Sequence, residues 1–95
     1  MAYGVVHFFA GGTQAQYEAS TAAVHPGAGQ LPAGQILHIA GASDGGWTIV
    51  AVHDTKESWE TFRDGTLVPA MHDGIPGGFT APPAETVIDV STLVP

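Results

Sequence analysis

The stretch "ILHIAGASDGGWTIVAVHDT", Ile36 to Thr55, decides the fold. Its aliphatic and β-branched residues predict two strands, Gln35–Ala42 and Trp47–His53, and the intervening Ser-Asp-Gly-Gly is typical of a tight hairpin turn. Two histidines, His38 and His53, interrupt the apolar runs. The sequence therefore predicts an antiparallel hairpin, and its register decides on which face of the sheet each of the two histidines lies.

A turn centred on Asp44-Gly45 fixes which residues oppose each other. In this register Ala42 opposes Trp47, His38 opposes Ala51 and His53 opposes Ile36, and opposed residues share a face of the sheet. His38 and His53 are then diagonal neighbours, about 7 to 8 Å apart at the backbone. We therefore expect one face to carry both histidines and the other to carry the following, mostly aliphatic residues: Leu37, Ile39, Gly41, Thr48, Val50 and Val52.

The segments around the hairpin predict a helix between strands on each side. Before it, "AYGVVHFFA", Ala2–Ala10, is rich in strand-forming residues, and Gln14–Val24 has helical periodicity behind a capping box of Thr13 and Gln16. After it, Asp54 is expected to cap a second helix with Glu57 in its first turn.

Trp59, Phe62, Leu67 and Ala70 continue the second helix at roughly helical spacing. Pro69 lacks the donor for the carbonyl of Gly65, which predicts a kink or a break into two short helices. The segment Asp73–Ala84 is expected to be irregular and Thr86–Leu93 to form the last strand.

The predicted order βαββαβ indicates an α+β fold, with a four-stranded antiparallel sheet and two helices on one face, in a single domain of residues 1–95. Val5-Val6 and Phe8-Phe9 put apolar side chains on both faces of the sheet. Because the helices can cover only one face, we expect a second copy of the chain to cover the other, in a homodimer packed sheet to sheet.

Composition excludes several partners. The chain has two basic and nine acidic residues, a formal net charge of -7, so it offers no patch for nucleic acid or an anionic membrane surface. It contains no cysteine, which removes disulfides and thiolate chemistry. The N-terminus lacks the basic region of a signal peptide and no apolar run reaches membrane-spanning length, so a cytoplasmic protein is predicted.

"ILHIAG", "GGW" and "VHDTKESWETF...LVPAM" resemble the dimeric α+β barrel proteins, the ferredoxin-like superfamily that includes the antibiotic biosynthesis monooxygenases. The resemblance runs from "YGVVHFF" to "ETVIDV". It implies a small-molecule pocket between sheet and helices, and in enzymes of this kind often polycyclic or quinol-like substrates, several of them handled without metal or flavin. His53 stands where many relatives carry an aromatic residue, and the Asn-Trp-His set of the haem-degrading relatives is missing.

The face that carries the histidines is the predicted site. We expect His7, His38, Trp47 and His53 around one cavity, with Tyr3 at its edge. His38 is the first candidate for a general base that makes an electron-rich anion able to react with oxygen, and His53 and His7 would assist without a bound cofactor. Trp47 would contact the substrate.

Other side chains have two interpretations. Trp59 and Phe62 are core residues or substrate contacts, and His72 caps a helix end or forms part of a lid. Arg63 can bind a ligand carboxylate, but pairing with Glu60 or Asp64 is the simpler expectation.

Three classes of function stay open at this point. The first is a cofactor-independent, monooxygenase-like homodimeric enzyme for a hydrophobic or aromatic molecule, and the second is a non-catalytic ligand-binding or interaction module with structural histidines. The third is a metal- or haem-dependent enzyme, with Asp54 or Asp89 near the histidines. No histidine pair has the HxH or HxxxH spacing of local metal ligands, so no metal site is assigned.

Overall fold

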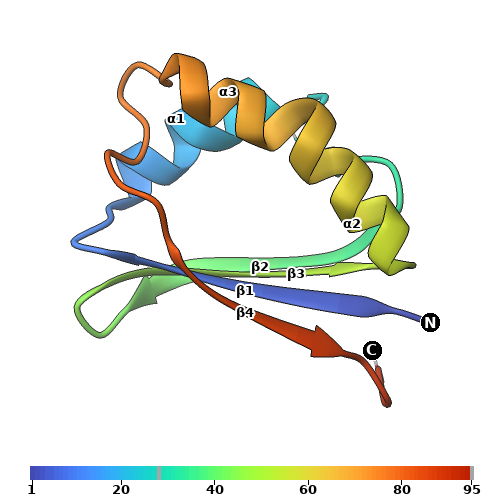
Figure 1. Cartoon of the computed structure of the whole chain (residues 1–95). Coiled ribbons are helices and arrows are strands. Elements are labelled where there is room, and N and C mark those ends of the chain that lie inside the picture. Colours follow the sequence, from blue (N-terminus) through green and yellow to red (C-terminus); the bar gives the residue numbers. More distant parts are fainter. Residues whose placement is uncertain (28, 95) are drawn as a thin grey trace.

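A computed structural model describes residues 1–27 and 29–94. Helices lie on one face of a single sheet, and the described part of the chain places no helix on the other (Figure 1). The elements follow in the order β1 (Tyr3–Ala10), α1 (Gln14–Val24), β2 (Gln35–Ser43), β3 (Gly46–His53), α2 (Lys56–Phe62), the π-helical segment η1 (Arg63–Leu67), α3 (Val68–Asp73) and β4 (Ala84–Asp89). The predicted α+β, ferredoxin-like βαββαβ architecture is confirmed.

The sheet is antiparallel with strand order β2-β3-β1-β4. The predicted hairpin register is confirmed along most of its length, since Ala42 pairs with Trp47 and His38 with Ala51. At its far end the register shifts, because a β-bulge inserts Ile36 as an extra residue in β2. His53 therefore opposes Gln35, and the predicted pairing of His53 with Ile36 is wrong.

Strand β1 places its histidine on the same face. Tyr3 pairs with His53 and His7 pairs with Ile49, so the odd-numbered residues of β1 share the face of the hairpin histidines, as predicted. On the other side His7 pairs with Glu85 of β4. All three sheet histidines thus face the helices.

Side-chain caps start both of the longer helices. Thr13 and Gln16 form the predicted capping box of α1. At α2 the cap is Thr55, whose hydroxyl accepts from the Ser58 N–H at 3.0 Å, so the prediction that Asp54 caps this helix is wrong. The Asp54 N–H instead donates to the Gly34 carbonyl at 2.8 Å, which holds Asp54 in the preceding turn.

The interruption predicted near Pro69 takes the form of a π-helical segment that joins α2 to α3. The Val68 N–H donates to the Arg63 carbonyl, five residues back, and Pro69 lies in the first turn of α3, where a missing donor costs little. The chain passes through the three segments as one rod (Figure 1).

Strand β4 is shorter than predicted and starts earlier. Its partner is β1, where Tyr3 pairs with Asp89, and one further bond joins the Val90 N–H to the Ala2 carbonyl at 3.1 Å. The strand ends there because β1 ends, so the prediction that it continues to Leu93 is wrong.

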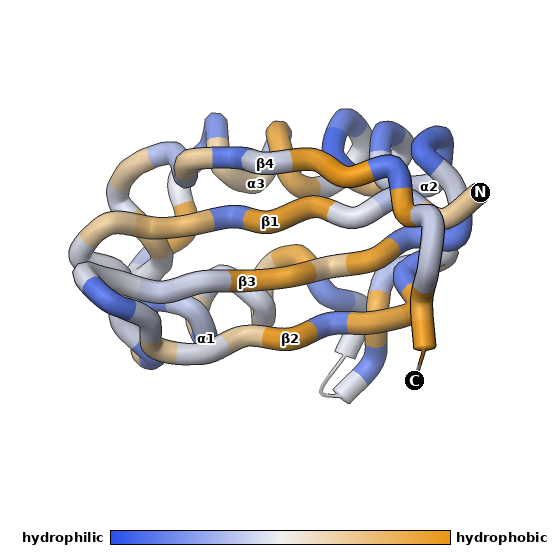
Figure 2. Tube along the Cα trace, turned by 90° about the horizontal axis from the view of Figure 1, so that it is seen from below, coloured by the Kyte–Doolittle hydropathy of each residue, from blue (hydrophilic) through white to orange (hydrophobic). Residues whose placement is uncertain are grey.

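The two sheet faces differ in what covers them. Under the helices, Tyr3, Val5 and Trp59 form the buried core. Apolar stretches run along all four strands (Figure 2), and Ile39 and Ile88, which the register places on the face away from the helices, are 56% and 48% exposed. In the ranges 1–27 and 29–94, no helix is long and apolar enough to span a membrane.

Candidate functional site

A cavity of about 70 Å³ lies between the sheet and the helices. Its walls are mainly aromatic and aliphatic, with a few polar groups at its ends. Toward β4 it adjoins a wider depression of about 480 Å³, and the two share one wall made of His7, Phe9, Trp59, Leu67, Met71, Ile75 and Phe79. An apolar chamber with few polar groups is the usual form of a small-molecule site.

At the β2 end of the cavity a chain of hydrogen bonds runs from helix α1 into the sheet. The Tyr17 hydroxyl lies 2.6 Å from His38 Nε2, and His38 Nδ1 lies 2.8 Å from Gln35 Oε1. Gln35 Nε2 in turn lies 3.2 Å from His53 Nε2. The glutamine thus bridges the two hairpin histidines.

The chain continues behind the cavity. His53 Nδ1 lies 2.9 Å from Ser58 Oγ, and that hydroxyl donates to the Ala33 carbonyl at 3.2 Å. His53 is fully buried, with 0% exposure. We call this series of groups, from Tyr17 to the Ala33 carbonyl, the histidine chain.

Burial favours the neutral form of the imidazoles in the histidine chain. It lowers the pKa of His38 and of His53, and the charge of Asp54 only partly opposes the effect at His53. The His25 ring stands edge-on to His38 with 5.1 Å between centroids, and it lowers the pKa of His38 further. Burial also raises the pKa of Tyr17, which keeps its phenol protonated.

His7 forms a second polar centre where the cavity meets the β4 depression. Its Nε2 lies 2.8 Å from Glu85 Oε2, and its ring packs edge-on against Trp59 at 5.7 Å between centroids. The His7 side chain is 14% exposed and Glu85 44%. Within the described part of the chain no group hydrogen-bonds His7 Nδ1, so this nitrogen is available to a ligand.

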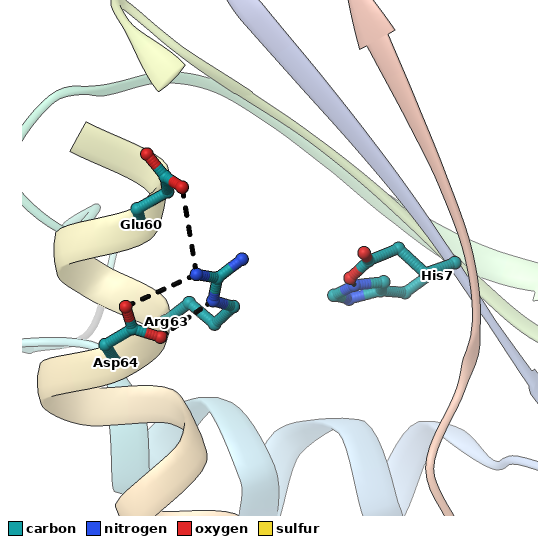
Figure 3. A network of polar contacts seen from close by, with 5 residues as sticks. His7, Glu60, Arg63 and Asp64 are labelled. Carbon is teal, nitrogen blue, oxygen red and sulfur yellow. Dashed lines mark hydrogen bonds and ion pairs between the residues drawn. The ribbon is translucent and has the colours of Figure 1, made fainter. Parts of the chain in front are cut away.

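Arg63 faces His7 across the depression (Figure 3). Its Nε lies 2.8 Å from Asp64 Oδ1 and its Nη2 3.9 Å from Glu60 Oε2, so the predicted pairing with nearby acids is confirmed. The hydrogen bond that Arg63 donates to Asp64 is the main cause that raises the Arg63 pKa, with smaller Coulombic contributions from Asp64, Glu60 and Glu85. Arg63 therefore brings little free positive charge to the depression.

Comparison with solved structures gives the fold independent support. The chain is similar over its whole length, and over the whole length of the other chain, to the structure of Rv0793 from Mycobacterium tuberculosis, with a TM-score of 0.70 and 15% identity. The likeness establishes the fold. No protein-family model matches the chain, and no curated protein is significantly similar to it.

The histidines and tryptophan predicted around one cavity occupy different layers. His7 and His38 both line the cavity, from β1 and β2, which lie on either side of β3. His53 lies behind it and reaches it only through Gln35. Trp47 is buried next to the Tyr17 ring, 5.2 Å between centroids, and does not line the cavity.

The remaining predicted residues are also placed. Tyr3 lies in the core with Val5 and Trp59. Trp59 and Phe62 line the cavity, and each contacts His53. His72 borders the outer depression with its side chain 87% exposed, 3.6 Å from Asp73.

Sequence reasoning missed four polar residues: Tyr17, Gln35, Ser58 and Glu85. Tyr17 was visible only as one apolar position of a helix, and Gln35 reaches the site only because of the bulge. Glu85 precedes the strand predicted from the sequence, so its pairing with His7 was hidden. Within residues 1–27 and 29–94, no three histidine or acidic side chains gather as metal ligands would.

Proposed function

We propose that the chain is a small homodimeric enzyme that binds an apolar or aromatic molecule between sheet and helices and removes a proton from it. The observation that carries the proposal is the His7–Glu85 pair at the rim of an apolar cavity. A carboxylate that accepts from one imidazole nitrogen orients the ring and fixes the tautomer in which the other nitrogen carries a free lone pair. His7 Nδ1 can therefore act as a general base toward a molecule in the cavity.

The size of the cavity indicates how such a molecule would lie. A dry cavity of about 150 Å³ admits benzene, whereas the inner cavity measures about 70 Å³. A ring can enter it only partly, so the rest of the molecule would occupy the β4 depression and pass His7 at the junction. The stacked pair Phe9 and Phe79, 3.7 Å between centroids, lies along this path.

His38 would act at the inner end through Tyr17. Both His38 nitrogens are already hydrogen-bonded, so a ligand hydroxyl would meet the Tyr17 oxygen first. As the ligand proton moves to Tyr17, the Tyr17 proton can move to His38 Nε2. In this proposal His53 holds Gln35 behind His38, and Trp47 supports the Tyr17 ring without touching the ligand.

The anion formed by proton removal suits oxidation by molecular oxygen as co-reactant. When a carbon bearing two hydrogens becomes a carbonyl, one oxygen atom enters the product, and the other leaves as water with those two hydrogens. This monooxygenase-like outcome needs no electron donor beyond the substrate. No resident cofactor is assigned to the site.

Each chain would form a single α+β domain. Two copies would pack through their open sheet faces into a dimeric α+β barrel. Exposed Ile39 and Ile88 make that face apolar, and packing it against a second copy would remove this surface from water. The cytoplasmic location predicted from the sequence is compatible with this reaction and stays a prediction.

Turnover of phenols and naphthols, whose keto tautomers contain a carbon bearing two hydrogens, tests the enzyme when it is followed as oxygen consumption. We expect His7→Gln to lower kcat/KM on an accepted compound by roughly 10²- to 10⁴-fold and Glu85→Gln by roughly 10- to 100-fold. Glu57→Gln is the matched control for Glu85→Gln, since Glu57 is exposed and lines neither the cavity nor the depression. Full activity of His7→Gln would refute the assignment.

A non-catalytic ligand-binding module is the second candidate. It is favoured by the histidine chain, where all ring nitrogens of His38 and His53 already bond to the protein, as structural histidines do. Saturable binding of the same compounds with no oxygen consumption would support this candidate over the first.

A further inference from the structure

Hydrogen-bond donation along the histidine chain runs in one direction, which is set where Ser58 meets the Ala33 carbonyl. The Ala33 carbonyl can only accept a hydrogen bond, so the Ser58 hydroxyl donates its single hydrogen to it. Toward His53, Ser58 Oγ is then an acceptor, and the His53 nitrogen beside it, Nδ1, has to carry the proton.

The direction of donation at one group fixes the direction at the next, because each neutral imidazole has one donor nitrogen and one acceptor nitrogen. With its proton on Nδ1, His53 accepts at Nε2 from the Gln35 amide nitrogen. The Gln35 oxygen accordingly faces His38 and accepts from its Nδ1–H. His38 Nε2 is left as an acceptor, and it receives the Tyr17 hydroxyl hydrogen.

A reversed chain would leave a group without its partner. With the Gln35 amide turned over, His53 would need its proton on Nε2, and its Nδ1 would need the Ser58 hydrogen. That hydrogen could no longer reach the Ala33 carbonyl, so the observed hydrogen bond from Ser58 to Ala33 would be lost.

We infer that Ser58 and Gln35 are positioning residues that fix the proton of His38 on Nδ1, so that the Tyr17 hydroxyl offers the cavity only its lone pairs. The inner end of the cavity would then select a ligand that brings an O–H or N–H donor. This specificity rests on the proposed function, whereas the direction of the histidine chain is a property of the free protein.

Long-range ¹H–¹⁵N NMR of the free protein near pH 7.5 tests the direction, because it identifies the protonated nitrogen of each neutral imidazole. We expect His38 and His53 with the proton on Nδ1, and His7, which donates from Nε2 to Glu85, in the opposite tautomer. The exposed His72 provides the reference signal. A proton on Nε2 of neutral His38 or His53 would overturn the inference.

Two substitutions of Gln35 separate positioning from packing. Gln35→Glu keeps an acceptor for His38 but removes the donor to His53, so we expect His38 unchanged and a proton newly on His53 Nε2. Gln35→Leu has similar size and no polar atom, so His38 should become a mixture of tautomers. If Gln35→Leu fails to fold, the wild-type and Gln35→Glu spectra still decide.

Phenol and anisole, which differ by the donor hydrogen, test the specificity. Titrated by NMR, phenol should bind roughly 2- to 10-fold more tightly, the range expected for one added hydrogen bond. The ratio should persist in Gln35→Glu and fall toward one in Gln35→Leu and Tyr17→Phe.

The outcomes separate the two proposals. Equal or tighter binding of anisole to the wild type would overturn the specificity. If neither probe binds while the tautomers are as stated, the proposed function fails and the positioning role stands.

Discussion

Acidification from pH 7.5 to 5.5 should destabilise this protein through its neutral histidines. Burial lowers the pKa of His25, His38 and His53 below the ordinary value of 6.5. The unfolded chain therefore takes up protons as the pH falls through 6.5, while the folded chain does so only at lower pH. Stability is fully present above pH 6.5 and is lost as the pH falls toward the folded pKa values.

The size of the loss follows from proton linkage. A histidine that stays neutral in the folded state and has a pKa of 6.5 when unfolded costs about 1.4 kcal/mol at pH 5.5 and about 0.1 kcal/mol at pH 7.5. Three such residues set an upper limit of about 4 kcal/mol. A 95-residue domain has a free energy of unfolding of about 5 to 14 kcal/mol, so the loss is a large share of it.

Urea unfolding at constant protein concentration, followed by the fluorescence of buried Trp47 and Trp59, measures this loss. His53→Asn removes one titrating group and keeps a donor near Ser58, so its loss should be smaller by up to about 1.4 kcal/mol. The control His72→Asn should lose as much as the wild type. A free energy of unfolding that stays constant or rises between pH 7.5 and 5.5 would refute the reasoning.

Three further changes have defined outcomes. Ile39→Lys on the open sheet face should convert a dimer into a monomer in analytical ultracentrifugation. The control Val68→Lys, on exposed α3, should leave the protein dimeric. If the Ile39→Lys variant stays dimeric, this interface is excluded. Thr13→Ala removes the capping box of α1 and should lower the free energy of unfolding by about 1 kcal/mol, measured in urea. Gly34→Ala should cost more than about 1 kcal/mol, since Gly34 has φ +83° and a Cβ there would collide with Ser58, and unchanged stability would contradict the packing described.

The sequence predicted the fold well because its signals are local. The capping box of Thr13 and Gln16 marked the start of α1, and the Asp44-Gly45 turn fixed most of the β2–β3 register. Alternation along β1 divided its residues between two faces, and the polar character of Tyr3 and His7 placed them with the hairpin histidines. Each of these inferences needed only neighbouring residues and one periodicity.

The details of the site were less predictable because they depend on long-range pairing. Nothing near His7 in the sequence indicates Glu85, since that contact needs the register of β1 with β4. Trp47 and His53 lie on the predicted face, but Tyr17 and Gln35 stand between them and the cavity. Alternation gives the face of a side chain, and it does not give the depth at which neighbouring side chains cover it.

The bulge at Ile36 shifts the alternation of side chains between the two faces of the sheet in strand β2. In a regular strand residues 35 and 38 point to opposite sides, because three positions is an odd number of steps. The extra residue absorbs one step, so Gln35 and His38 point the same way and the amide reaches both imidazoles. If the same residues formed a regular strand without the bulge, Ile36 would oppose His53 and Gln35 would point outward, so a one-residue shift separates a connected proton path from two isolated histidines.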